Sequence, residues 1–137
     1  MPTITKEGHM ETLKLMLSKN LVLRLFENDI KPDYYSTIND FKEVGSGGYS
    51  PKILNASKWK FGFIEDIPVA VYPEQLFIFN GPVGLIFGSY ITDTNGEVVR
   101  IAKRFDDGPY EVLRMKDNIT VGPKIRLPIL DKPKRHE

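Results

Sequence analysis

The sequence contains no cysteine and only two histidines among its 137 residues. Without cysteine there can be no disulfide bond, thiolate metal site or cysteine nucleophile. Small secreted domains often need disulfides, so this absence also favours a protein made in a reducing compartment. The two histidines, His9 and His136, stand near opposite ends of the chain. A histidine metal site would need them to converge, so we expect both to be solvent residues and predict no metal or other cofactor.

The chain also lacks an excess of either charge and a long apolar run. Its formal net charge is +1 and its pI is about 7.9. Nucleic-acid-binding domains usually concentrate basic residues, so we expect no nucleic-acid partner. No apolar run approaches the roughly 20 residues that span a bilayer. The polar start, with Glu7 and Glu11, does not resemble a signal peptide. We expect a soluble, unprocessed protein with no membrane partner.

Hydrophobic residues make up 41% of the chain and charged residues 27%, as in an ordinary globular domain. One helix is predicted, from about Thr5 to Lys19, because Met10, Leu13 and Leu17 recur at helical spacing. After Asn20 the apolar residues alternate, which is typical of strands.

The remaining chain has the pattern of short strands separated by turns. The predicted strand regions are Leu21–Phe26, Lys58–Ile64, Val69–Val71, Leu76–Phe79, Val83–Asp93, Glu97–Phe105, Tyr110–Lys116 and Ile119–Leu127, and Pro51–Ala56 is predicted as a short strand or a turn. Asn95-Gly96 predicts a type I′ hairpin turn, because both residues tolerate positive φ, so we expect Glu97–Phe105 to pair antiparallel with Leu85–Asp93.

Many short strands at close spacing favour a sandwich or a barrel. We predict a mostly β fold: an antiparallel, jelly-roll-like β-sandwich with one short N-terminal helix. The expected organisation is an N-terminal helix or arm over residues 1–20, a β-sandwich domain over 21–127 and an extended C-terminal tail over 128–137.

Residues suited to catalysis are not arranged in a known pattern. Asp106-Asp107 lacks the further oxygen ligands of a calcium loop, and the glycine-rich Gly45–Gly48 lacks the Lys-Ser or Lys-Thr pair of a phosphate loop. Glu65-Asp66, or Asp40 with Glu43, could be imagined as paired glycosidase carboxylates, although nothing in the sequence sets their separation. We therefore predict that the protein is not an enzyme.

Aromatic and basic side chains are the candidates for a protein interface. They are Tyr34, Tyr35, Tyr49, Trp59, Lys132, Lys134 and Arg135. Aromatic residues can anchor an interface, fill a core or stack on nucleic-acid bases. The near-zero net charge disfavours the last role, whereas the first two stay open.

The order of short motifs resembles a family of small β-domain virion proteins of tailed bacteriophages. The matching segments are Leu25-Phe26-Glu27-Asn28-Asp29, Ser36-Thr37, Asp40-Phe41, Gly48-Tyr49, Trp59, Tyr72-Pro73, Phe77-Ile78-Phe79, Gly88-Ser89-Tyr90-Ile91-Thr92-Asp93, Ala102-Lys103-Arg104-Phe105, Gly108-Pro109 and Ile119-Thr120-Val121-Gly122-Pro123. They extend from about Leu21 to Leu127.

The resemblance implies a structural component of the virion, assembled in the cytoplasm of the host bacterium. A capsid cement or decoration protein fits best, with the major capsid protein and further copies of itself, as a homodimer or homotrimer, as partners. The alternatives are a tail, connector or fibre-associated subunit, and a carbohydrate- or ligand-binding β-domain.

Overall fold

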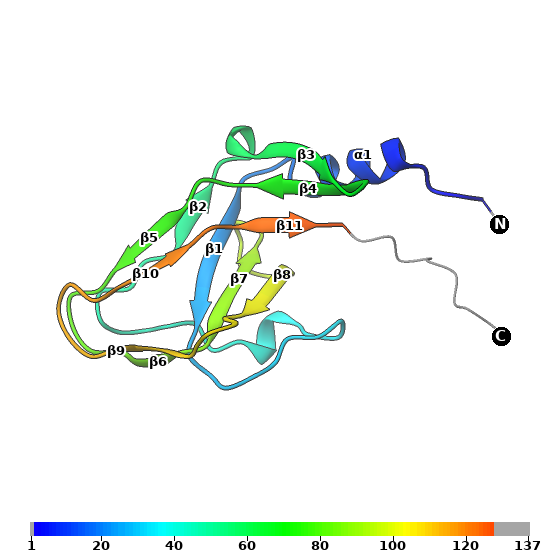
Figure 1. Ribbon diagram of the computed structural model, residues 1–137. Helices are drawn as coiled ribbons and strands as arrows, with labels where there is room; N and C mark the ends of the chain where they lie inside the picture. The colour runs from blue at the N-terminus through cyan, green and yellow to red at the C-terminus, as the bar shows by residue number, and fades with distance from the viewer. Residues whose placement is uncertain (1, 128–137) are drawn as a thin grey trace.

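A computed structural model of the protein describes residues 2–127, and about 38% of the chain lies in strands. The strands form antiparallel sheets, and the described residues include one α-helix, so the mostly β prediction is confirmed. The elements are α1 (Lys6–Met16), β1 (Leu21–Phe26), η1 (Ile38–Asp40), β2 (Lys52–Leu54), η2 (Ala56–Lys58), β3 (Lys60–Ile64), β4 (Ile67–Val71), β5 (Gln75–Ile78), β6 (Gly84–Ile86), β7 (Gly88–Thr92), β8 (Val99–Arg104), β9 (Tyr110–Val112), β10 (Asn118–Val121) and β11 (Lys124–Arg126). Figure 1 shows their arrangement.

Strands β4 to β11 pair in a nested order. Strand β7 pairs with β8, β6 with β9, β5 with β10 and β4 with β11, and every pair is antiparallel. The segment from Ile67 to Thr92 therefore runs back along the segment from Val99 to Arg126 as one long, folded ribbon. Strands β1 and β2 extend the β7–β8 end to the order β2-β1-β7-β8, and β3 adds to the outside of β4.

The two arms of this ribbon bend at matching places. Between β4 and β5 the chain passes Pro73, and between β10 and β11 it passes Gly122-Pro123, with the Tyr72 amide donating to the Pro123 carbonyl at 3.0 Å. Farther along, Phe79 exchanges backbone hydrogen bonds with Lys116 and Asp117 across two adjacent turns. Proline has no N–H group to donate to a neighbouring strand, so it interrupts the pairing at these places. Because both arms are interrupted at the same level, the strands on either side stay paired.

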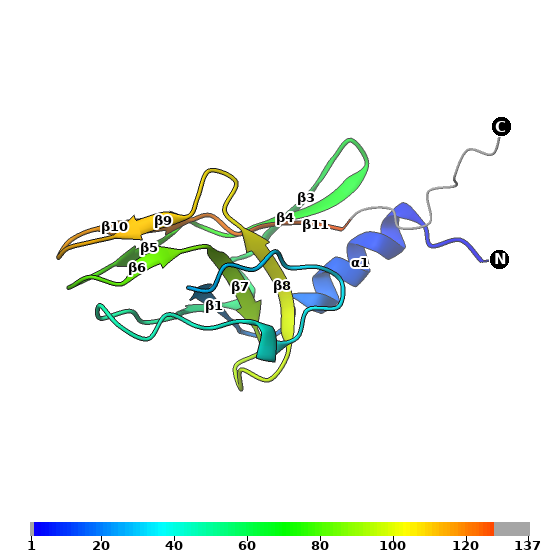
Figure 2. The ribbon, with the colours of Figure 1, turned by 90° about the horizontal axis from the view of Figure 1, so that it is seen from below.

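One apolar core joins the helix to the sheets. Leu13 and Leu17 of the helical segment lie in the same buried cluster as Leu23, Ala70 and Ile125. The Thr5 hydroxyl caps the start of α1 by accepting from the Gly8 amide at 3.1 Å. The segment expected as an arm ahead of the β-domain is thus packed into the core. Figure 2 shows α1 at the opposite end of the molecule from the turn that joins β5 to β6.

A second aromatic cluster covers the outer face of the four-stranded sheet. Phe26 packs edge-on against Phe41, with ring centroids 5.3 Å apart, and Phe41 stacks on Tyr90 at 4.6 Å. The long segment between β1 and β2 carries Phe41 over this face. Both faces of β1 are therefore buried, which explains why its sequence is apolar at nearly every position.

The hairpin between β7 and β8 differs from the predicted two-residue type I′ turn. Only Gly96 has a positive φ, of 71°, and the loop extends from Asp93 to Val98. The Asp93 carboxylate accepts from the amides of Glu97 (2.9 Å) and Val98 (3.3 Å). These side-chain hydrogen bonds stabilise a longer loop, which the Asn-Gly pair alone does not indicate.

Other predicted boundaries were too long. The run from Val83 to Asp93 divides into β6 and β7, and the run from Ile119 to Leu127 divides into β10 and β11 at Gly122-Pro123. The helix ends at Met16 rather than near Lys19, because the Leu17 backbone leaves the helical region (φ −108°, ψ 17°) and the Ser18 amide bonds the Leu15 carbonyl, three residues back.

At Gly88 the backbone of β7 lies very close to β8 and to the Phe26 ring, so a substitution there tests the packing of the four-stranded sheet. A Cβ atom at Gly88 would overlap the Lys103 carbonyl and the Phe26 ring. We expect Gly88→Ala to lower the free energy of unfolding by about 1–3 kcal/mol, as overpacking does. Urea titration measures this change. The matched control is Gly62→Ala, because a Cβ there has no neighbour within 4 Å; equal stability of both variants would contradict the packing described here.

Candidate binding site

Tyr34 and Tyr35 form an exposed aromatic pair on the loop that follows β1. Their side chains are 93% and 83% exposed, and their rings meet edge-to-face with centroids 5.3 Å apart. Asp33 fixes the loop, since its carboxylate accepts from the Tyr35 amide at 2.9 Å and its own amide donates to the Ser36 hydroxyl at 2.9 Å. An ordered loop that presents two aromatic rings has the properties of an interface anchor.

The structure places Trp59 in the core and Tyr49 at its border. Trp59 is 6% exposed and packs edge-on against Tyr72, with ring centroids 5.0 Å apart. Its Nε1 has no hydrogen-bond partner among the described residues. Tyr49 stacks on Phe77 at 6.0 Å. Trp59 therefore lies in the core, which is one of the two roles that the sequence left open for it.

The other predicted interface residues, Lys132, Lys134 and Arg135, lie outside the described residues. The sequence-based candidates therefore fall into two groups in the structure: an exposed pair, Tyr34 and Tyr35, and two rings packed within the chain, Tyr49 and Trp59.

A polar network lies at one end of the four-stranded sheet. The Arg24 guanidinium donates to the Glu43 carboxylate at 3.0 Å and to the Thr92 hydroxyl at 2.9 Å. The Tyr49 hydroxyl donates to Glu43 at 2.7 Å and accepts from the Leu25 amide at 3.0 Å. The network thereby attaches the segment between β1 and β2 to the sheet.

Burial and the neighbouring carboxylate alter the acidity of two tyrosines there. Burial, followed by the hydrogen bond to Glu43, raises the pKa of Tyr49 well above its usual range. Burial, followed by the negative charge of Glu43, raises the pKa of Tyr90 to about 12. Both hydroxyls therefore stay protonated at neutral pH.

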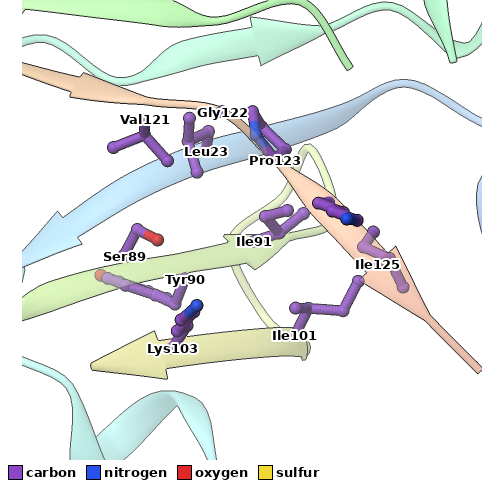
Figure 3. Close-up of a pocket in the computed structure, with 11 residues that line it drawn as sticks. Leu23, Ser89, Tyr90, Ile91, Ile101, Lys103, Val121, Gly122, Pro123 and Ile125 are labelled. Atoms are coloured by element: carbon purple, nitrogen blue, oxygen red, sulfur yellow. The ribbon is translucent and has the colours of Figure 1, made fainter. Parts of the chain in front are cut away.

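A small apolar cleft opens between the four-stranded sheet and the segment of β10 and β11. Leu23, Ile91 and Ile101 line one side, and Val121 and Ile125 line the other (Figure 3). Its volume is about 100 Å³. Pockets for small molecules usually hold about 300–1,000 Å³, so this cleft is suited to a single apolar side chain.

The acidic residues singled out in the sequence serve local structure. Asp106 pairs with Lys103 at 3.3 Å, and Asp107 accepts from the Tyr110 hydroxyl. Glu65 and Asp66 form the turn between β3 and β4, where both have positive φ. Among residues 2–127, no three His, Asp or Glu side chains gather where they could hold a metal ion.

Two features of the site were not anticipated from the sequence: the Arg24–Glu43 pair and the cleft. The signal for the pair was Arg24 itself, a charged residue inside an otherwise apolar strand, because such a residue needs a partner when it is buried. The cleft depends on contacts between distant strands and has no local signal.

Comparison with protein-family models, with curated proteins and with solved structures finds no match to this chain. Within the described part of the chain, no helix has the length and apolar character needed to cross a bilayer.

The raised tyrosine pKa values predict how stability depends on pH. Unfolded tyrosine releases its proton near pH 10, whereas Tyr49 and Tyr90 retain theirs in the folded state. The contribution of each raised pKa to the free energy of unfolding is complete below pH 10. It is lost as the pH rises toward the folded pKa, by about 1.4 kcal/mol per pH unit for each group.

We expect Tyr49→Phe to lower the free energy of unfolding at pH 7 by about 1–3 kcal/mol, because the Leu25 amide loses its acceptor. The same variant should lose less stability than the wild type between pH 10 and 11. Urea titration at each pH measures both effects, with Tyr34→Phe as the exposed control. If the free energy of unfolding of Tyr49→Phe fell between pH 10 and 11 as steeply as that of the wild type, Tyr49 would not be a source of the pH dependence.

Proposed function

We propose that the protein is a non-enzymatic structural component of a tailed-bacteriophage virion. Its role would be that of a capsid cement or decoration protein, which binds the shell of the major capsid protein and associates with further copies of itself. The motifs between Leu21 and Leu127 that resemble virion β-domains favour this assignment over other binding roles.

The nested strand pairing supports a jelly-roll-like sandwich for this domain. In a jelly roll, a long two-stranded ribbon folds over itself so that the outermost strands pair with each other and successive pairs lie inside them. The order β4–β11, β5–β10, β6–β9 and β7–β8 has this form. A sandwich of this kind would suit a cement protein, which must keep its shape while neighbouring subunits pull on it.

The exposed Tyr34–Tyr35 pair is the observation that carries the binding role. Two tyrosines that are almost wholly exposed in the isolated chain leave a large area available for burial against a partner. Tyrosine loses little conformational entropy on binding, and the hydrogen bonds of Asp33 already order the loop. Such a contact is individually modest, but a domain that bridges several shell subunits binds them together more tightly than each alone.

The location can be tested by imaging particles. Particles purified from a lysate of cells that carry the gene should contain the protein, and averaged density of a labelled copy should be spread over the shell. Density at one vertex would assign the protein to a connector, tail or fibre instead. Absence of the protein from purified particles would refute a virion role altogether.

The contribution of the tyrosine pair can be tested separately. We expect Tyr34→Ala/Tyr35→Ala to weaken binding to particles that lack the endogenous protein by roughly tenfold or more, as loss of an aromatic hot spot does. The melting temperature should not change, because both rings are exposed. Tyr110→Ala, which removes a half-buried tyrosine outside the loop, is the control for general effects on folding. Unaltered particle binding by the double variant would show that the pair is not an anchor.

One observation favours a second candidate, a carbohydrate- or ligand-binding domain. An open groove of about 400 Å³ lies between the tyrosine loop and β8, and its lining includes Tyr34 and Arg100. This volume falls within the range of small-molecule sites. Selective binding on a glycan array that Tyr34→Ala abolishes would support this candidate over the cement role.

A further inference from the structure

Strand register divides the side chains of the β11-β4-β3 sheet between two faces. Directly paired residues of antiparallel strands point to the same side. Lys60 of β3 and Lys124 of β11 both pair with Val71, and Gly62 and Arg126 both pair with Val69. These residues therefore share one face. Phe61, Ala70 and Ile125, in alternate positions, share the other.

The face with Ala70 belongs to the core and to helix α1. Ala70 and Ile125 lie in the main buried cluster with Leu13 of the helix. The Lys14 ammonium lies 5.9 Å from the centre of the Phe61 ring. The opposite face is the outer one, and we call Lys60, Val69, Val71, Lys124 and Arg126 the lysine–valine face.

The charge of the lysine–valine face has one sign. Strands β3, β4 and β11 contain three ionisable residues, Lys60, Lys124 and Arg126, and all three lie on this face and are exposed. No carboxylate of residues 2–127 forms an ion pair with them. In the β3–β4 turn, Asp66 is already paired with Lys6 at 3.0 Å.

The centre of the face is apolar and partly accessible. Val71 is 44% exposed, although it lies in the middle strand with a lysine on each side, whereas Val69 is 3% exposed. Ile64, on the same side near the end of β3, is 46% exposed. Apolar side chains surrounded by charges reproduce the anatomy of a protein interface, with an apolar centre and a polar rim.

We propose that the lysine–valine face is a second surface that contacts the capsid shell, besides the Tyr34–Tyr35 pair, and that it binds an acidic protein surface there. Adjacent strands lie about 4.8 Å apart, so Lys60 and Lys124 are separated by about 10 Å across Val71. We expect the partner's surface to carry carboxylates about as far apart as Lys60 and Lys124, with an apolar group between them that meets Val71. This inference rests on the proposed function, because it identifies which face of the protein meets the shell.

The composition of the face distinguishes a protein partner from other anions. It contains no aromatic ring on which nucleic-acid bases could stack, since Phe61 and Phe63 point to the opposite side. The net charge of +1 also provides little attraction for a phosphate backbone. Membrane-surface sites combine basic residues with large inserting side chains such as Trp, Phe or Leu, whereas the centre here is valine.

The test uses particles purified from cells in which the gene has been deleted, to which purified full-length protein is added back. The variant is Lys60→Glu/Lys124→Glu/Arg126→Glu. Its matched control, Lys19→Glu/Lys42→Glu/Lys116→Glu, changes the net charge equally at exposed lysines elsewhere. We expect the first variant to bind at least roughly tenfold more weakly, and the control to bind like the wild type. Added salt should weaken the binding of the wild type and the control.

The outcomes separate this inference from the proposed function. Failure of the wild type to bind the particles overturns both. Equal binding by all three proteins overturns the role of the lysine–valine face and leaves the proposed function standing. If the reversed variant unfolds at a lower temperature, Lys60→Gln/Lys124→Gln/Arg126→Gln replaces it under the same criteria.

Two further arms test the class of partner. Wild-type protein is mixed with a DNA duplex and, separately, with vesicles that contain phosphatidylserine. We expect negligible binding in both. Tight binding to either probe that the charge-reversed variant loses would assign the face to nucleic acid or to lipid, and would overturn the protein partner.

Discussion

The long folded ribbon of β4 to β11 is the constraint on which the rest of the structure depends. Its two arms meet at the short loop between Thr92 and Val99, and at the other end they bring together Val71 and Lys124, which are distant in sequence; four successive strand pairs join the arms. The register of each strand pair determines which side chains of the following pair face the core. A shift of one residue would move every core side chain of a strand to the opposite face of the sheet. The matched bends at Pro73 and Gly122-Pro123 let the ribbon turn without separating its arms.

The segment between β1 and β2 is held by a different kind of interaction. Its aromatic residues cover the outer face of the four-stranded sheet, and Glu43 joins Arg24 and Tyr49 at the margin. Breaking such a partly buried pair leaves a charge without its partner, so the network specifies one position for the segment. The Tyr34–Tyr35 loop belongs to that segment, and its fixed position follows from the same contacts.

Local patterns in the sequence predicted the strands well, and they predicted one strand pairing correctly, the β7–β8 hairpin. The alternation of Leu21, Leu23 and Leu25 located β1 correctly, because burial on one face repeats every second residue. The Asn95-Gly96 pair located the β7–β8 hairpin correctly but not the form of its turn, since Asp93 forms hydrogen bonds that the dipeptide does not encode. For Trp59, the sequence left both core and interface open, and the contact with Tyr72 places it in the core.

The same alternation that builds the core also determines the chemistry of the surface. Lys124 and Arg126 alternate with Ile125, and once Ile125 enters the core the two cations must lie together on the outside. Pairing with β4 then brings Lys60 into the same row as Lys124. The backbone that presents these side chains is fixed before a partner arrives, so only the side chains lose conformational entropy in a complex. The register that stabilises the fold therefore also prepares the surface for recognition.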